Sequence, residues 1–487
     1  MNMNLQFYNQ LTKKVDYFTP LVAGQVSLYT CGPTVYDYLH IGNWTAYIYW
    51  DTLVRVLQAN DLKVNRVMNI TDVGHLVSDD DDGEDKLEKG AKRDGKTAWD
   101  VAAFYTKDFL TGMERLNLVA PSHITKATDY IEEQLQLVRT LQEKGFTYQI
   151  DDGIYFDTAL FPSYGDFAGL DLKAQKAGAR VEFNPQKRNH SDFALWKFTA
   201  PGEKRDMEWL TPADLVSDGK LHQGFPGWHL ECSAMAMALL GNTLDLHTGG
   251  IDHIPVHHTN EIAQSEAATD VQFARYWLHN NHLKVHGTKI SKSLDNGFTL
   301  DTLQTMGFSP IDFRMFVLQS HYRSESNFSH DNLVSAQNRL KNWRNVAALR
   351  HQTHDRLRDD DEKSTDDKSV SLYASSRVVI EALSNDLDTP AACTIIDEAF
   401  SRLQGSATES IHQHALISFL ETIDETLGLQ LIESTGDISD DVKRLIIERE
   451  RSRENQDWNT ADDLRMTIEK SGITVRDTAH GSIWEYN

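Results

Sequence analysis

A short turn near the N-terminus carries side chains that can bind an anion. The tetrapeptide His40-Ile41-Gly42-Asn43 follows a β-rich segment that ends at Cys31, and helical periodicity begins directly after it. An imidazole and an amide then sit at a helix N-terminus, where unpaired N–H groups and the macrodipole favour negative charge. Gly42 lets a nucleotide approach the backbone closely. His40 can equally serve only to cap or pack the helix start, so both interpretations stay open.

A second segment far downstream combines two ammonium groups with two hydroxyl groups. It is Lys289-Ile290-Ser291-Lys292-Ser293, and it lies between Gly287 and Gly297. A loop of this composition can close over a triphosphate and neutralise the charge that develops during transfer. Taken by itself, the segment also fits an ordinary solvated loop.

A third group of residues has the chemistry of a metal site. His257 and Glu261 are four residues apart, so both point from one face of a helix. With Cys31 and Cys232 they make a Cys₂HisGlu set whose donor atoms suit zinc. Separated cysteines are also common as buried thiols, and His/Glu pairs are common on surfaces, so the pattern alone leaves both possibilities open.

The elements that must position these residues form a βαβ unit. Residues 26–31 are β-rich, Gly32-Pro33 interrupts them, and apolar residues then recur at helical spacing until a second strand-like segment, 64–70. A connection long enough for a helix predicts two parallel neighbouring strands of a Rossmann-type doubly wound sheet. Ligands of such α/β sheets bind beyond the C-termini of the strands, and Cys31 and His40 are expected to lie there.

The rest of the chain is less regular. Apolar residues at helical spacing predict a helix over 131–141 closed by Gly145, followed by a β-hairpin around Asp152-Gly153. The chain to about Gly224 lacks βα rhythm, which indicates an inserted α+β subdomain, and the rhythm returns at 244–247. Beyond about Asn332, helical periodicity dominates.

Composition narrows the function classes. The 487 residues, 40% of them hydrophobic, imply several folded domains, and no apolar run of about 18 residues predicts a membrane span. The first residues do not resemble a signal peptide, and three dispersed cysteines indicate a reducing cytoplasm. We therefore expect a cytoplasmic protein that does not bind membranes, and nothing in the sequence demands more than a monomer.

Charge sets a condition on any nucleic-acid partner. Forty-eight basic and 72 acidic residues give a net charge of −24, which disfavours nonspecific binding to nucleic acid. A local cationic track is still possible. Two helical segments are candidates, 339–350 around Trp343 and 443–453, although each can also be a solvated helix face.

The order of these motifs along the chain resembles that in the cysteinyl-tRNA synthetases, a family of class I aminoacyl-tRNA synthetases. The resemblance extends over nearly the whole chain and includes further short strings. These are Asn69-Ile70-Thr71-Asp72, Ala177 to Val181, Lys187-Arg188-Asn189, Gly227 to Cys232, Leu195-Trp196-Lys197, Asp386 to Pro390, and Asp457-Trp458 with Ala461-Asp462.

The resemblance implies five regions. They are the first half of the catalytic domain (1–120), the connective insertion (121–224), the second half with the Lys289 loop (225–331), a helical bundle of the tRNA-binding type (332–430) and a small anticodon-binding module (431–487).

The resemblance also implies roles for individual residues. One Zn²⁺ per chain would be held by Cys31, Cys232, His257 and Glu261. Thr71 and Trp228 match positions that line the amino-acid pocket. ATP would be bound by His40, Gly42, Asn43, Lys289, Ser291 and Lys292, of which His40, Asn43, Lys289 and Lys292 would be catalytic.

The implied reaction has two steps and three substrates. L-Cysteine would be activated with ATP, accompanied by Mg²⁺, to cysteinyl-adenylate, and the cysteinyl group would then pass to the 3′ end of tRNA(Cys). Cysteine and serine differ by one atom, and a pocket discriminates near-isosteres poorly. A thiophilic metal supplies the missing selectivity.

Four residues depart from the family pattern, and two other functions stay open. Trp44-Thr45 stands where the family usually has a small residue and an Arg, Ile290 replaces Met, and Asp295 replaces Gly. The chain could instead be a mycothiol-type ligase that joins activated cysteine to an amino-sugar, although about 140 residues follow Arg350. It could also be a catalytically silent paralogue that binds tRNA.

Overall fold

The computed structural model describes residues 4–73, 85–170, 184–290, 296–352, 367–404, 411–478 and 481–487. Three residues of interest from the sequence, Ser291, Lys292 and Asp295, lie outside these ranges, as does the string from Ala177 to Val181. Among the described residues, no helix is at once long and apolar enough to cross a bilayer.

The centre of the molecule is a five-stranded sheet in which all strands are parallel. Its spatial order is β12 (Ala274–Asn280), β11 (Leu244–Gly250), β3 (Gln25–Thr30), β4 (Lys63–Ile70) and β5 (His123–Lys126). The chain therefore reverses its direction of progress across the sheet between β3 and β11. This confirms the predicted doubly wound fold and places its topological switch beside Cys31.

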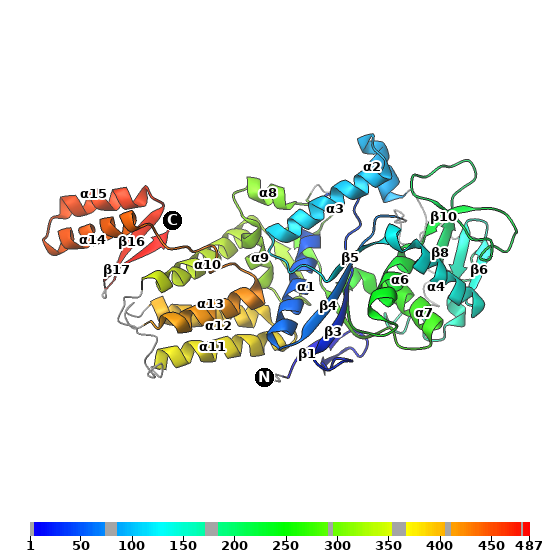
Figure 1. Ribbon diagram of the computed structural model, residues 1–487, viewed down its shortest axis with the longest axis horizontal. Coiled ribbons are helices and arrows are strands. Elements are labelled where there is room, and N and C mark those ends of the chain that lie inside the picture. The colour runs from blue at the N-terminus through cyan, green and yellow to red at the C-terminus, as the bar shows by residue number, and fades with distance from the viewer. Residues whose placement is uncertain are drawn as a thin grey trace.

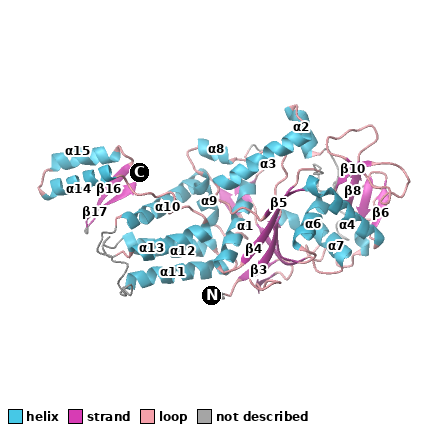
Figure 2. Ribbon diagram, viewed as in Figure 1, coloured by secondary structure: helices cyan, strands magenta, loops and turns pink. Residues whose placement is uncertain are grey.

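Helices cover both faces of this sheet (Figures 1 and 2). One face carries α1 (Ile41–Ala59) and α9 (Pro310–Leu318), and the other carries α6 (Trp228–Leu240) and α7 (Thr259–Thr269). The predicted strand, helix and parallel strand from β3 through α1 to β4 are present.

The segment between β5 and α6 folds as a separate antiparallel sheet. Helix α4 (Ile131–Glu143) leads into the predicted hairpin of β6 (Thr147–Ile150) and β7 (Gly153–Phe156). The sheet continues with β8 (Phe193–Phe198), β10 (Gln223–Pro226) and β9 (Trp209–Leu210), and it lies at one end of the elongated molecule (Figure 1).

The C-terminal part is helical, as predicted. Its elements are α10 (His330–Ala348), α11 (Asp367–Ser384), α12 (Thr389–Gln404), α13 (Gln413–Leu427), α14 (Asp440–Glu454), α15 (Trp458–Glu469), β16 (Ile473–Thr478) and β17 (Gly481–Tyr486). The last four form a module at the opposite end from the antiparallel sheet (Figure 1).

The remaining elements join or flank these parts. They are β1 (Gln6–Asn9), β2 (Lys14–Tyr17), α2 (Lys86–Asp94), α3 (Ala98–Arg115), β13 (Leu283–Val285), β14 (Thr288–Lys289), α8 (Leu300–Thr305) and β15 (Ser326–Phe328).

A buried ion pair joins α1 to the helical region. Arg314 of α9 and Asp51 of α1 are both completely buried and in contact, and Arg314 also donates to the carbonyl of Leu427 at 2.6 Å. Burial favours the neutral acid, but the guanidinium groups of Arg314 and Arg55 hold the pKa of Asp51 below its usual range. The pair fixes α1 against α13, which ends at Leu427.

Trp44, one of the departures from the family pattern, is a packing residue. Its ring stacks on Phe109 of α3 with centroids 5.5 Å apart. A Cβ atom on Gly112 would lie only 2.3 Å from the Trp44 ring. The large side chain on α1 therefore requires a glycine on α3.

We expect Gly112→Ala to lower the free energy of unfolding by about 1–3 kcal/mol, because the added methyl group overpacks a rigid contact. Urea unfolding measures the change. Gly90→Ala in α2 is the matched control, since its Cβ would meet no atom closer than 3.4 Å. Trp44→Leu in the Gly112→Ala background should recover stability, and equal stability of Gly112→Ala and the parent chain would contradict this packing.

Candidate active site

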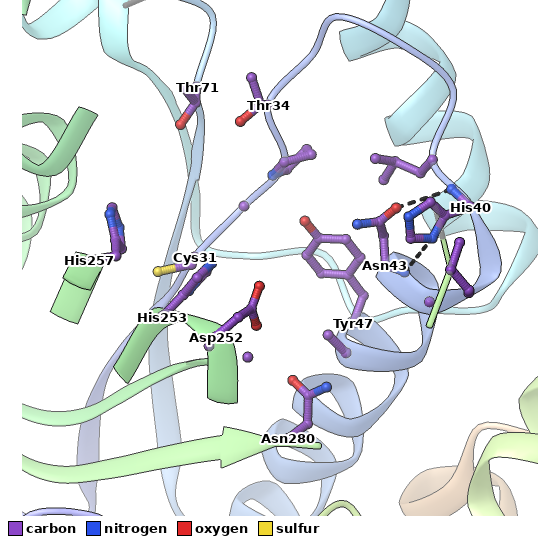
Figure 3. A pocket seen from close by; sticks show the side chains of 18 of the residues that line it. Cys31, Thr34, His40, Asn43, Tyr47, Thr71, Asp252, His253, His257 and Asn280 are labelled. Carbon is purple, nitrogen blue, oxygen red and sulfur yellow. Dashed lines mark hydrogen bonds between the residues drawn. The ribbon is translucent and has the colours of Figure 1, made fainter. Parts of the chain in front are cut away.

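A cavity of about 530 Å³ opens at the topological switch of the parallel sheet. It is lined by residues that follow the ends of β3, β4, β11 and β12 and by the first turn of α1. Figure 3 shows Cys31 and His257 on one side of this cavity and His40 and Asn43 on the other. Two predicted groups, one of metal ligands and one of anion-binding residues, thus share one pocket.

His40 and Asn43 form a reciprocal cap at the start of α1. The backbone N–H of Asn43 donates to His40 Nδ1 at 3.3 Å, and the backbone N–H of His40 donates to Asn43 Oδ1 at 3.1 Å. The dashed lines in Figure 3 mark these bonds. Both side chains also line the cavity, so the cap is present and does not exclude a role in anion binding: it fixes the imidazole at a helix N-terminus.

Cys31, Cys232, His257 and Glu261 converge as the sequence predicted. All four side chains are buried, and one ligand atom from each lies within 4.8 Å of the others. His257 Nε2 is 2.8 Å from Glu261 Oε1. Residues 254–258 form a π-helical turn that contains His257, and α7, which follows it, contains Glu261. Together they place both side chains next to Cys232 of α6. The donor set and its spacing can hold a metal ion.

A second layer of imidazoles supports these four residues. His229 Nδ1 is 2.9 Å from His257 Nδ1, and His247 Nε2 is 2.8 Å from Glu261 Oε2. His258 Nε2 lies 3.4 Å from the Cys31 thiol. Because of these contacts, Cys31, His247, His258 and Glu261 form a second set able to hold a metal, overlapping the first.

Sequence reasoning missed His247, His258 and His279. His247 lies in the middle of β11, His279 is the last residue but one of β12, and His258 Nδ1 is 2.7 Å from His279 Nε2. The available signal was a histidine in each of two strand-forming segments, 244–250 and 274–280. Their convergence depends on strand order, which no local pattern contains.

Burial and neighbouring charges shift the pKa values of this group. A hydrogen bond from Cys31 is the main cause that lowers the pKa of Cys232 to about 6, whereas burial raises the pKa of Cys31 well above its ordinary value. Burial would raise the pKa of Glu261, but the imidazoles of His247 and His257 hold it well below its usual range. One thiol and the carboxylate are thus available in anionic form.

The predicted amino-acid pocket residues line the same cavity. Thr71 follows β4 and is buried, and its hydroxyl oxygen accepts a hydrogen bond from Asn69 Nδ2 at 3.1 Å. The Trp228 ring lies with its centroid 4.4 Å from that of His257. Both residues line the cavity that also contains Cys31, Cys232 and His257.

Lys289 and Ile290 reach the cavity from β14 and the residue after it. A Cβ on Gly42 would lie 3.0 Å from both the His40 ring and the Ile290 side chain. A glycine at this position therefore leaves room for these two side chains at the edge of the cavity. Thr45 is buried and donates to the Ile41 carbonyl at 2.8 Å. Neither Trp44 nor Thr45 lines the cavity.

One of the two candidate RNA tracks is largely internal. Trp343 and Arg350 are buried, and Arg350 donates to Thr435 Oγ1 at 2.7 Å. Arg339 pairs with Asp397, to which Trp343 Nε1 also donates. In the candidate track over 339–350, these side chains therefore hold α10 against α12 and the following chain, whereas Lys341 is exposed.

Comparison with known proteins identifies the family. Residues 17–338 match the tRNA synthetases class I (C) catalytic domain, and residues 435–484 match the cysteinyl-tRNA ligase anticodon binding domain. The chain belongs to the cysteine–tRNA ligase family. The cysteine–tRNA ligase of Treponema denticola is 38% identical over 99% of this chain and 100% of its own length. Cysteine–tRNA ligase 1 of Burkholderia lata is 41% identical over 98% of this chain and 96% of its own length.

Solved structures agree on the fold. Mycobacterium tuberculosis methionyl-tRNA synthetase in complex with methionyl-adenylate matches with a TM-score of 0.55 at 15% identity, over 84% of this chain and 91% of that one. The Agrobacterium radiobacter LeuRS–tRNA–LeuAMS ternary complex matches with a TM-score of 0.61 at 12% identity, over 87% of both chains.

Membership in the cysteine–tRNA ligase family decides between the functions that the sequence left open. The relatives match over their full length, and the anticodon binding domain is part of the match. The chain is a class I aminoacyl-tRNA synthetase of the cysteine type, and neither the amino-sugar ligase nor the silent paralogue is favoured.

His40 both caps α1 and lines the cavity, so its effects on stability and on activity should be separable. His40→Ala removes a helix cap and should cost about 1 kcal/mol in urea unfolding. His40→Asn supplies a good capping residue and should restore most of that stability while cysteine-dependent ATP–pyrophosphate exchange stays impaired. Full activity of His40→Asn would show that the residue acts only as a cap.

Proposed function

We propose that this chain activates L-cysteine with ATP at the switch-point cavity and transfers the cysteinyl group to tRNA(Cys), with zinc selecting the substrate thiolate. The observation that carries this proposal is the placement of the Cys₂HisGlu group and the His40–Asn43 cap around one cavity. Cysteine-dependent ATP–pyrophosphate exchange tests the first step. Charging of tRNA(Cys), compared with an amino-sugar acceptor, tests the second.

The chemistry of the donors fits one zinc ion per chain. Cys31, Cys232, His257 and Glu261 supply the sulfur, nitrogen and oxygen donors that zinc accepts. A bound zinc ion supplies a preference for thiolate over hydroxyl. We assign it to this set rather than to the overlapping set with His247 and His258, because two thiols suit zinc better than one.

In the first step, a carboxylate oxygen of cysteine attacks the α-phosphorus of ATP, and the bond to pyrophosphate breaks as pyrophosphate leaves with the electron pair. Thr71 and Trp228 border the amino acid, and the N-terminus of α1 with His40 and Asn43 faces the phosphates. Gly42 lets the nucleotide approach. Mg²⁺ accompanies the ATP phosphates and is held mainly by them.

The basic loop completes the nucleotide site in this proposal. Lys289 lines the cavity, and the chain then enters residues 291–295, which lie outside the described residues. We assign to Lys292 the neutralisation of charge on the leaving pyrophosphate, with Lys289 and Ser291 assisting.

In the second step, a hydroxyl group of the terminal adenosine of tRNA attacks the carbonyl carbon of the adenylate. The bond between the carbonyl carbon and the AMP phosphate oxygen breaks, AMP leaves with the electron pair, and the hydroxyl proton passes to a phosphate oxygen of the departing AMP. Positioning suffices, because acyl-adenylates are already reactive. We further propose that the chain acts as a monomer in the cytoplasm, where tRNA is charged.

Metal content should separate the two overlapping ligand sets. Cys232→Ala should lose stoichiometric zinc and cysteine affinity while ATP binding persists, because Cys232 belongs only to the first set. His258→Gln should keep its zinc, because His258 belongs only to the second. Elemental analysis and isothermal titration with each substrate measure these outcomes. The reverse pattern would place the ion in the second set.

Lys292→Ala should slow cysteinyl-adenylate formation about 10²-fold or more without changing zinc content, since one preorganised charge at the reacting phosphates is worth this much. Single-turnover pyrophosphate release measures the rate. Lys284→Ala, on β13 outside the cavity, is the matched control. An unchanged rate in Lys292→Ala would remove its assigned role.

A further inference from the structure

The string Asp386 to Pro390 resembles the family, yet none of its residues lines the active-site cavity. It leads from α11 into α12, and Asp386 and Leu387 both have positive φ angles, 57° and 55°. Leucine rarely adopts this left-handed conformation, and consecutive non-glycine residues keep it only where the surrounding structure holds them. Both residues are buried. Their contacts must therefore stabilise a backbone conformation that is unfavourable by itself.

The Asp386 carboxylate accepts hydrogen bonds from two other parts of the chain. Its Oδ1 atom accepts from the Tyr322 hydroxyl at 2.6 Å and from the backbone N–H of Tyr8 at 2.7 Å. Its Oδ2 atom accepts from Arg323 Nε at 2.7 Å, and the Arg323 guanidinium group lies over the Tyr8 ring. Asp386 therefore joins the helical region to β1 and to the turn of residues 319–325, which connects α9 with β15.

This turn supports one wall of the active-site cavity. The backbone N–H of Asn281 donates to the Tyr322 carbonyl at 2.8 Å, and Asn281 Nδ2 donates to the Arg323 carbonyl at 3.1 Å. The Asn281 side chain also accepts from the backbone N–H of His282 at 2.7 Å. Asn281 and His282 both line the cavity. A single residue of the turn thus separates the buried carboxylate of Asp386 from the cavity wall.

The same wall leads to the basic loop assigned to ATP. It continues into β13, which pairs with β14, and β14 ends at Lys289 in the same cavity. Asn280 precedes the wall, lines the cavity and is almost completely buried, and its Oδ1 atom has no hydrogen-bond partner among the described residues. Figure 3 shows this side chain pointing into the cavity. Because an unpaired buried acceptor costs free energy, a bound ligand that donates to it would be stabilised.

The residues that border cysteine in the proposed reaction come from other elements. Thr71 follows β4, and Trp228 is the first residue of α6. A movement of the wall at Asn281 and His282 should therefore disturb the nucleotide more than the amino acid.

We propose that Asp386 is a positioning residue for ATP. Its carboxylate holds the 319–325 turn, and the turn holds Asn281 and His282 where they border the bound nucleotide. The left-handed backbone at Asp386 is required because it brings the carboxylate to this turn. The proposal rests on the proposed function, since it concerns the ATP of the first step. It makes nucleotide binding depend on a residue of the helical region that lies outside the cavity.

Two substitutions that tolerate a positive φ angle test this role. Asp386→Gly removes the carboxylate and should raise both the dissociation constant and KM for ATP about tenfold, while KM for cysteine stays within about twofold of the parent value and zinc content is unchanged. Asp386→Asn should raise KM for ATP only about threefold, because its amide oxygen still accepts from the Tyr322 hydroxyl but does not neutralise Arg323. Isothermal titration with ATP, ATP–pyrophosphate exchange and elemental analysis measure these outcomes.

Asp270 provides a matched control. It also has a positive φ angle, 60°, and its carboxylate pairs with Lys144 at 2.6 Å, but this ion pair joins the end of α7 to the end of α4. Asp270→Gly and Asp270→Asn should leave both KM values at the parent level. An equal rise of KM for ATP in Asp270→Gly would assign the effect to backbone freedom and would contradict the proposal. Urea unfolding identifies conditions in which every variant is folded.

A double-mutant cycle tests the path through the turn. Tyr322→Phe removes only the hydroxyl group that donates to Asp386, and it should raise KM for ATP about threefold. In the Asp386→Gly background the same substitution should have no further effect, because the acceptor is already absent. If Asp386→Gly does not fold, Tyr322→Phe decides by itself, since an unchanged KM for ATP in this variant contradicts the proposed path.

Three results would overturn the proposal. They are unchanged ATP affinity in Asp386→Gly, equal increases of KM for ATP and for cysteine, and independent, multiplying effects of Tyr322→Phe and Asp386→Gly. Titration with ATP alone needs neither cysteine nor tRNA, so it reports on Asp386 whatever the acceptor is. Failure of the parent chain to catalyse cysteine-dependent exchange would instead contradict the proposed function, and the two failures are distinguishable.

Discussion

The site depends on the divergence of two neighbouring parallel strands. The backbone N–H of Cys31 donates to the Thr248 carbonyl at 3.2 Å, at the end of the pairing between β3 and β11. Beyond this point, β3 leads to α1 on one face of the sheet and β11 leads to α7 on the other. Because the connections leave in opposite directions, a crevice opens between them. Among the described residues, those assigned to binding or chemistry lie in or beside this crevice.

The crevice contains polar and charged side chains whose burial costs free energy. A completely buried carboxylate and several buried imidazoles are stable in a folded protein only when they neutralise and hydrogen-bond one another. Glu261 is held between His247 and His257, and His257 is held in turn by His229. Each candidate ligand is thus oriented by a second residue. This is the arrangement that gives a metal site defined geometry and that makes the ligands insensitive to small loop movements.

Helix α1 links this chemistry to the distant helical region. Its first turn carries His40 and Asn43 into the cavity, while Asp51 in its middle is fixed to Arg314 and, through Arg314, to the end of α13. The chain that follows α13 receives the hydrogen bonds of Arg350, which anchor it to α10. Buried guanidinium groups therefore connect the catalytic sheet to the part of the chain that leads into α14, α15 and their hairpin, and they do so through rigid elements.

Local patterns in the sequence determined the βαβ unit, the β6–β7 hairpin, the helical C-terminal region and the spacing of His257 and Glu261. These features depend on residues close together in the chain, where backbone geometry and apolar periodicity act directly. The same locality limits such reasoning. Only strand order brings His247 close to Cys31 and His279 into contact with His258. Only packing shows that Trp44 lies against Gly112, or that Trp343 is buried. These contacts join residues far apart in sequence, and their free energy comes from burial in a shared interior that no single segment encodes.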